Sequence, residues 1–276
     1  MLGRDHVSIT FGTVFPFTIP LIFSESSHPV YAFCLLVAAV IGSLMPDVDS
    51  DEKPKLHYDF KIIYYIMVPL HKLIVFSFSF FNLKEKMNLQ YVVEEQHRGI
   101  MHSPIGVFIS SFVLTLLTTI VGYFIFHGIN ANLIGFLFLG LISGQFLHLL
   151  EDSCTASGIK WLFPFGTGEL KGNIYTGNKI EGKKDIRPFL YRVFLLFFSA
   201  TLLILHLLGT IDVNKSGIYL LIFAVITLIW SLIFLTAKID NDKLWIHDAK
   251  KVRKLERAID KIEKQEGIRK RRILGK

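Results

Sequence analysis

Residues 133–152 read LIGFLFLGLISGQFLHLLED, and this stretch indicates both the class of fold and the place to look for chemistry. Its first part, residues 133–150, contains no Asp, Glu, Lys or Arg. An apolar run of about 20 residues is long enough to cross the roughly 30 Å hydrocarbon core of a bilayer as an α-helix. We therefore expect a membrane-spanning helix here, which ends in a histidine and two carboxylates at the membrane surface.

Five further apolar stretches resemble this one. The average composition, by contrast, does not distinguish a membrane protein from a soluble one. With 51% hydrophobic residues and a mean hydropathy of +0.47, the chain is close to soluble domains in apolar content. Its apolar residues, including most of the 25 Phe, are instead concentrated in long runs almost free of charge. We expect an all-α, polytopic membrane helix bundle of about six spans. The expected spans are residues 7–23, 31–45, 103–126, 133–150, 189–208 and 217–236.

A seventh apolar stretch, residues 62–81, has polar residues at its middle. Pro69, His71 and Lys72 occupy that position, and a Lys at the bilayer centre costs at least about 2.5–3.5 kcal/mol. We therefore expect a re-entrant, interfacial or bundle-buried helix pair here rather than a span.

The basic charge of the chain belongs to its C-terminal tail. From position 238 to the end, 14 Lys and Arg outnumber 7 Asp and Glu, which accounts for the whole net charge of +7. Basic flanks favour the cytoplasmic side, so we expect both termini in the cytoplasm. Residues 1–237 would form a membrane-embedded domain with a metal site. Residues 238–276 would form a basic helical tail, solvated or in contact with anionic lipid headgroups, and no nucleic-acid partner is expected.

Histidines and carboxylates gather at the ends of the expected spans. His148 and Asp152 are four residues apart on a helix, so their side chains share one face. Asp47 and Asp49 follow the second span and can converge from a turn. If residues 62–81 do not cross, all these motifs fall on the cytoplasmic face. The candidate metal ligands are His6, Asp47, Asp49, His97, His102, His148 and Asp152.

Imidazole and carboxylate donors suit a divalent metal ion, with zinc as the leading candidate and manganese or iron as alternatives. Each motif alone has an ordinary explanation, such as an acidic helix end or a hydrogen-bonded histidine. Their combination favours a functional site, because ionisable groups at membrane depth are costly. A calcium loop of the EF-hand type is excluded, because Glu52 and Tyr58 stand where it needs Gly and Glu.

Two further residues near these motifs are candidates for catalysis. The planar guanidinium of Arg98 suits two phosphate oxygens, and Glu151 could serve as a ligand or a general base. A transporter and a scaffold with a structural metal stay open as alternatives to an enzyme. The position of the cluster at span ends, away from the bilayer midplane, argues against a transporter.

At these residues the chain resembles the YdjM-like family of membrane-bound metal-dependent hydrolases, over roughly residues 1–180. The matching pieces are His6, the block GSLMPDVD at residues 42–49, His97-Arg98-Gly99 with His102-Ser103, and His148 to Asp152 followed by Thr155, Gly158, Trp161, Phe163 and Pro164. The resemblance implies hydrolase activity. The spacing of His148 and Asp152 is also similar to the all-helical zinc-dependent phospholipase C group, which implies a phosphoester or lipid-linked substrate.

Overall fold

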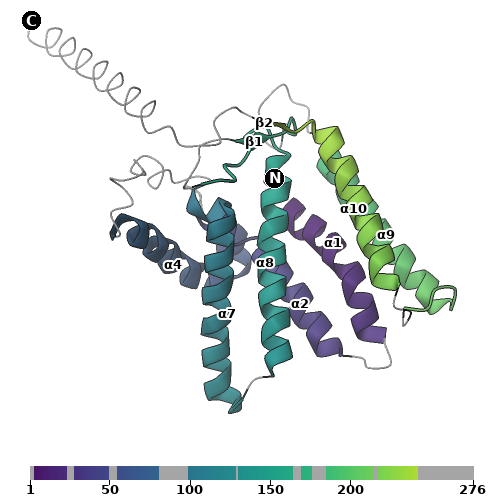
Figure 1. The fold of residues 1–276 in the computed structure, drawn as a ribbon, viewed down its shortest axis with the longest axis horizontal. Helices are drawn as coiled ribbons and strands as arrows, with labels where there is room; N and C mark the ends of the chain where they lie inside the picture. Colours follow the sequence, from purple (N-terminus) through teal and green to yellow (C-terminus); the bar gives the residue numbers. More distant parts are fainter. Residues whose placement is uncertain are drawn as a thin grey trace, which may run out of the picture.

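The protein is a bundle of long helices in a computed structural model (Figure 1). The structure describes residues 3–23, 28–49, 55–80, 99–128, 130–163, 169–175, 185–213, 215 and 217–241. Among these described residues, six helices are long and apolar enough to cross a membrane, which confirms the expected all-α membrane bundle. They are α1 (Gly3–Phe23), α2 (Pro29–Gly42), α7 (Pro104–Phe126), α8 (Ala131–Ser153), α9 (Arg187–Leu207) and α10 (Ile218–Ala237).

The second span is built differently from the others. α2 itself has 14 residues, which at 1.5 Å per residue is too short to cross a bilayer. A turn and the 3-10 helix η1 (Pro46–Asp49) continue it, so that the whole candidate span runs over Pro29–Asp49. The acidic residues of η1 therefore lie at the membrane boundary.

The stretch with Pro69 at its middle is not among the six candidate spans, as expected. In place of the expected helix pair, α4 (Lys61–Phe80) is one helix that continues through Pro69, and a short α3 (Lys55–Asp59) precedes it. It is inclined to the long helices (Figure 1). One face packs against η1 and η2 (Ile100–His102) through Met67, Leu70 and Ile74. Apolar side chains also cover the exposed face, so α4 can lie against both bundle and lipid.

Glycines let α2 and α8 cross in close contact. A Cβ at Gly144 would lie 2.0 Å from the carbonyl oxygen of Ala39, and one at Gly140 would lie 2.6 Å from the Cβ of Ala38. Gly42 approaches α8 in the same way, with 2.5 Å to the carbonyl oxygen of Leu141. Small residues commonly allow such approach between membrane helices. This crossing fixes the end of α2 against the middle of α8, at residues 140–145.

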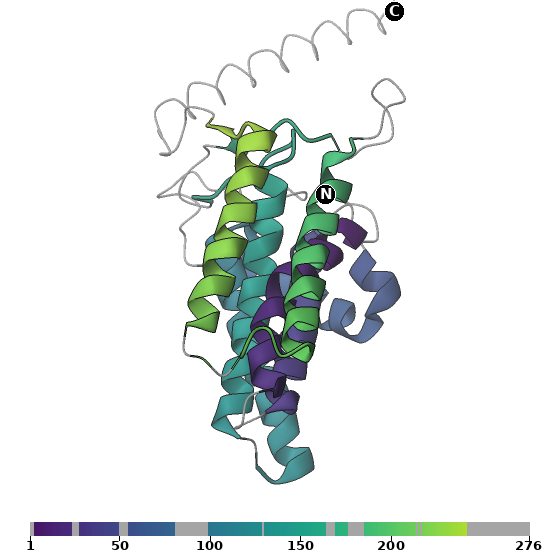
Figure 2. The same cartoon turned by 90° about the vertical axis from the view of Figure 1, so that its right-hand side faces the viewer.

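Helices α9 and α10 lie on the α1 side of the bundle (Figure 2). The side chain of Arg187, at the start of α9, donates to the carbonyl oxygens of Asn173 and Thr236, at 2.8 Å each, and pairs with Asp185 at 2.6 Å. The strands β1 (Leu170–Lys171) and β2 (Asp240–Asn241) pair antiparallel next to these contacts. The C-terminal tail, apart from residues 238–241, lies outside the described residues.

Candidate metal centre

Four segments that are far apart in the sequence meet at one end of the bundle. α1 begins there, η1 follows α2 there, η2 precedes α7 there, and α8 ends there. This arrangement requires that η1 and η2 lie on one side of the membrane, which agrees with α4 not being among the candidate spans. The segments bring together His6, Asp47, Asp49, His102, His148, Glu151 and Asp152.

Local sequence folds η2 back onto the first turn of α7. The hydroxyl of Ser103 caps α7 by accepting from the backbone N–H of Gly106 at 3.1 Å, and it donates to the carbonyl of Ile100 at 2.7 Å. A Cβ at position 106 would lie 1.9 Å from that carbonyl oxygen, so glycine permits the fold-back. His102 is thereby held in the interior, 1% exposed.

Two histidines and two aspartates face a common point. His102 Nε2 lies 3.7 Å from Asp47 Oδ1 and 3.9 Å from Asp152 Oδ2. His148 Nε2 lies 3.6 Å from Asp47 Oδ1 and 3.8 Å from Asp152 Oδ2. These separations are too long for hydrogen bonds. Two donors that are each about 2.1 Å from a tetrahedral ion lie about 3.4 Å apart. Each of the two imidazole nitrogens is therefore spaced from both carboxylate oxygens nearly as from a fellow ligand of one ion.

His6 adds a third imidazole to the same place. Its ring stacks on that of His148 with centroids 3.8 Å apart, and its Nε2 lies 3.5 Å from Asp152 Oδ1. Two sets of potential donors overlap at His148, one with His6 and Asp152 and one with Asp47 and His102. Because the Nδ1 of His148 is engaged by a carbonyl, only its Nε2 can face a metal. The two sets therefore adjoin at the Nε2 of His148.

The outer nitrogen of each histidine faces an oxygen atom. His148 Nδ1 is 2.7 Å from the carbonyl oxygen of Ser43, and His102 Nδ1 is 3.1–3.2 Å from the two carboxylate oxygens of Asp49. His6 Nδ1 lies 2.8 Å from Glu151 Oε2. Such partners orient the ring and fix its tautomer in protein metal sites, where histidine ligands usually have them.

The hydrogen bonding of His148 provides a test of whether a cation fits. A carbonyl oxygen only accepts, so His148 Nδ1 donates to Ser43, and the neutral ring keeps its lone pair on Nε2. That buried Nε2 has no hydrogen-bond partner among the described residues, and it points between two carboxylate oxygens. The negatively charged carboxylate oxygens repel this lone pair unless a cation lies between them. The donor set fits a divalent metal ion, since two carboxylates and three neutral imidazoles carry a charge of −2.

The electrostatics at His102 agree with this test. Burial lowers the pKa of His102, but the carboxylates of Asp49 and Asp47 outweigh burial and raise the pKa to about 10. The negative charge around His102 therefore favours a positive charge there, either a proton or a metal ion. Among the described residues of this centre, Asp47 provides an open edge, because its side chain is 23% exposed while those of the histidines are 0% exposed.

The structure distributes the sequence-predicted residues over two layers. Asp49, predicted as a ligand, lies on the outer side of His102 and also accepts from the backbone N–H of Gly99 at 3.0 Å. Glu151, predicted as ligand or base, lies on the outer side of His6. His97 and Arg98 lie outside the described residues. Sequence analysis missed the carbonyl of Ser43, and no sequence signal could have found it because a backbone carbonyl is common to all residues.

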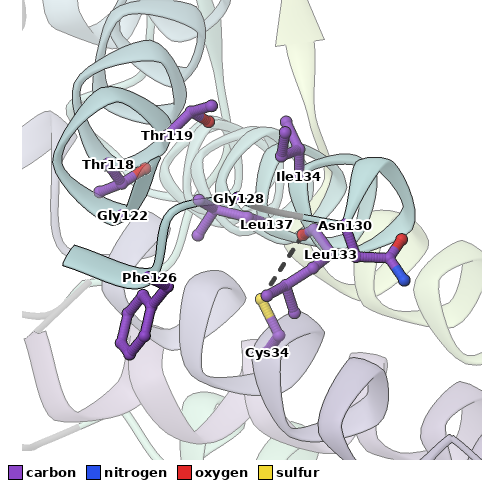
Figure 3. Close-up of a pocket in the computed structure, with 10 residues that line it drawn as sticks. All are labelled: Cys34, Thr118, Thr119, Gly122, Phe126, Gly128, Asn130, Leu133, Ile134 and Leu137. Atoms are coloured by element: carbon purple, nitrogen blue, oxygen red, sulfur yellow. Dashed lines mark hydrogen bonds between the residues drawn. The ribbon is translucent and has the colours of Figure 1, made fainter. Parts of the chain in front are cut away.

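A separate cavity of about 430 Å³ lies at the opposite end of the bundle (Figure 3). It is formed where α2 begins, α7 ends and α8 begins, and Cys34, Asn130 and Leu133 are among its lining residues. Cys34 Sγ lies 3.9 Å from the carbonyl oxygen of Leu133. This cavity contains none of the candidate metal ligands, so it is not part of the centre.

Comparison with known proteins identifies a family but no close relative. The family model described as YdjM inner membrane protein matches residues 1–239. The match covers all six spans and every candidate ligand. No curated protein and no solved structure matches the chain significantly.

Proposed function

The chain belongs to the YdjM inner membrane protein family, and on that basis we propose that it is a membrane-bound, metal-dependent hydrolase with its metal at the His/Asp centre. The proposed substrate is a phosphoester, soluble or lipid-linked. We place the centre at the cytoplasmic face, because the basic tail favours that side for the C-terminus.

The observation that carries the proposal is the common orientation of three buried histidines. Each turns Nε2 inward and has an oxygen next to Nδ1. A core histidine that serves packing alone has no reason to present a lone pair to two carboxylates. The inward atoms and the outer partners together form the two layers typical of a metal site.

We assign the inner layer as the metal ligands and the outer layer as positioning residues. The proposed ligands are His6, Asp47, His102, His148 and Asp152. Asp49 and Glu151 would orient His102 and His6 through Nδ1, as the Ser43 carbonyl orients His148. This assignment moves Asp49 and Glu151 out of the direct ligand and catalytic roles that the sequence suggested.

A bound divalent ion supplies Lewis-acid activation of water and of a phosphoryl oxygen. The exposed edge of Asp47 would be the side from which water and substrate approach. Hydrolysis adds water to phosphorus and breaks the P–O bond to the alcohol, which leaves with a proton. Arg98 remains the candidate for pairing with the phosphate, because it directly precedes Gly99, whose N–H contacts Asp49. The proposed basic tail would hold anionic headgroups near the same face.

A structural metal is the second candidate, and the burial of the donors favours it. Five protein donors would leave at most one position on a six-coordinate ion, and a closed site is typical of structural metals. Six coordination is common for manganese and iron, whereas zinc, the leading candidate from sequence, would use four of the five donors.

Metal analysis of the detergent-purified protein tests the proposal. We expect about one equivalent of zinc, manganese or iron in the wild type, and its loss in Asp47→Ala and His148→Ala. His28→Ala is the matched control, because His28 precedes α2 at the opposite end of the bundle. A wild type that stays metal-free after reconstitution would overturn the metal site.

A screen of phosphoesters then separates the two candidates. A catalytic metal predicts hydrolysis that requires the metal and returns when it is restored to the stripped protein. A structural metal predicts no hydrolysis and a large loss of thermal stability on chelation. Bound ligand at 100 times its Kd stabilises a protein by about 2.7 kcal/mol, which sets the scale of that loss.

A further inference from the structure

A groove of about 530 Å³ opens on the membrane-spanning surface between α1, α8 and α10, with α2 at its base. Its lining includes Thr13, Phe17, Ser143, Leu147, Phe223 and Ile226. The volume falls within the roughly 300–1,000 Å³ of small-molecule sites. We propose that this groove binds one hydrocarbon chain of a phospholipid and directs the polar end of that lipid toward the His/Asp centre.

The chemistry of the lining selects hydrocarbon over a polar ligand. The hydroxyl of Ser143 donates to the carbonyl of Gly140 at 3.1 Å within its own helix. The hydroxyl of Thr13 accepts from the indole N–H of Trp230 at 3.3 Å. Both hydroxyl groups are therefore engaged inside the protein, and most of the remaining wall is aliphatic or aromatic. A polar group in this groove would lose its hydrogen bonds to water without replacement.

The position of the groove in the bilayer identifies a lipid chain as its occupant. Phe223 is 62% and Leu139 is 52% exposed, so the groove opens on the surface that lipid covers. An unfilled void would forfeit the dispersion contacts of its lining atoms. From Phe136 to Leu147 the groove follows α8 for about 16 Å at 1.5 Å per residue, close to half of the roughly 30 Å hydrocarbon core. One acyl chain has this length.

The groove and the metal centre share the same faces of two helices. On α1, Thr13 and Phe17 continue a row that begins with His6 and Thr10, since steps of three or four residues stay on one face. On α8, Ser143 and Leu147 precede Glu151 at intervals of four. The groove therefore ends about one helical turn from Glu151, so a lipid of the leaflet on that side can lie with its chain in the groove and its polar end next to the centre.

This inference rests on the proposed function, which it deepens by naming a lipid phosphoester as the substrate class. A phosphate carried on a chain in the groove is held beside the centre and reaches the metal ligands through the exposed edge at Asp47. Substrates without a chain would lack this alignment and would reach the same edge from solution.

Photolabelling tests the groove without relying on activity. The full-length protein would be placed in phosphatidylcholine nanodiscs with phosphatidic acid that carries a diazirine on one acyl chain. We expect labelled peptides from the groove faces of α1, α8 and α10. Ser143→Phe fills the groove, and labelling there should fall by roughly tenfold, because each excluded methylene group contributes about fourfold to binding.

Ser231→Phe is the matched control. Ser231 is an exposed serine of α10 outside the groove lining, and its hydroxyl bonds to the carbonyl of Thr227 in its own helix at 2.8 Å. Its labelling should equal that of the wild type. Labelling spread evenly over the spans and insensitive to Ser143→Phe would overturn the inference. So would a dimer that covers the groove in the wild type and dissociates in Ser143→Phe.

Kinetics distinguish failure of the groove from failure of the hydrolase proposal. We expect Ser143→Phe to raise KM for a long-chain phosphatidic acid roughly tenfold and to leave hydrolysis of a short-chain, water-soluble phosphoester unchanged. Equal KM values for the long-chain lipid in both proteins would overturn the inference. If the metal-loaded wild type cleaves neither substrate, the hydrolase proposal fails, and the labelling result alone decides whether the groove holds a chain.

Discussion

The ring of His6 stacks on the ring of His148 with centroids 3.8 Å apart and an angle of 17° between their planes. This contact joins the first turn of α1 to the last turns of α8. Both rings are 0% exposed, and each has its outer nitrogen next to an oxygen. The stack therefore packs two helices together and at the same time places two imidazoles next to the carboxylate of Asp152.

Replacing His6 separates its packing role from its proposed role as a ligand. In His6→Phe a ring remains to stack on His148, but no nitrogen remains to bind a metal. We expect the fold to persist and metal affinity to fall by more than the roughly 10–100-fold typical for loss of an outer partner. Calorimetric titration with zinc or manganese, together with the far-UV circular dichroism spectrum, measures both. Unchanged metal affinity in a folded His6→Phe protein would exclude His6 as a ligand.

Asp49→Asn tests the assignment of Asp49 to the outer layer. The amide keeps the size of the side chain and can still accept from Gly99 and His102, but it carries no charge. We expect metal affinity to fall by about 10–100-fold with retention of one binding site. Asp152→Asn, which alters a proposed ligand, should abolish stoichiometric binding. If the two variants lose binding to the same extent, Asp49 is a direct ligand, as the sequence suggested.

The α2–α8 crossing can be tested with two glycines of one helix. In Gly144→Ala the new Cβ would lie 2.0 Å from the carbonyl oxygen of Ala39, whereas Gly135 has nothing within 4 Å of the equivalent position. We expect Gly144→Ala to lower the free energy of unfolding by about 1–3 kcal/mol through overpacking. Gly135→Ala should be neutral or stabilising by up to about 1 kcal/mol, because alanine favours helix.

Thermal unfolding in detergent, with and without chelator, measures these differences. The crossing also holds the Ser43 carbonyl against His148, so Gly144→Ala should weaken metal binding while Gly135→Ala leaves it unchanged. Equal stability of the two variants would mean that the helices do not approach as closely as the structure indicates.

Most of the helical framework was predictable from sequence because spans are encoded locally. A run without charge must become a helix in lipid, since every backbone group needs an internal partner. The expected span at residues 133–150 became Ala131–Ser153, and the others agree comparably. The exception is the end of α2, where the helix stops at Gly42 and a turn leads into η1. Glycine and proline at positions 42 and 46 permit this turn, which cannot be seen in a hydropathy profile.

The composition of the centre was also predictable, but its layers were not. The start of the first span and the end of the fourth must share a membrane face, because four crossings bring the chain back to the side on which it began. His6 could therefore be grouped with His148. Whether a carboxylate faces the metal or the outer nitrogen of a histidine depends on side-chain direction. Asp47 and Asp49 are two residues apart in one 3-10 turn, and only the tertiary structure separates inner Asp47 from outer Asp49.

The shared location of the ligands depends on α4 remaining on one side of the membrane, and cysteine labelling tests this directly. Tyr58 precedes α4, and Ile186 precedes α9; both are exposed at the end of the bundle where the centre lies. Asn132 and Thr210 are exposed at the other end.

With Cys34 and Cys154 replaced by serine, we expect single cysteines at positions 58 and 186 to react only with a reagent that reaches the cytoplasm. Cysteines at positions 132 and 210 should react with an impermeant reagent from outside. Labelling of position 58 from the side opposite to position 186 would place α4 or α7 in a different topology, and the ligand of η1 could then not share one metal with those of α8.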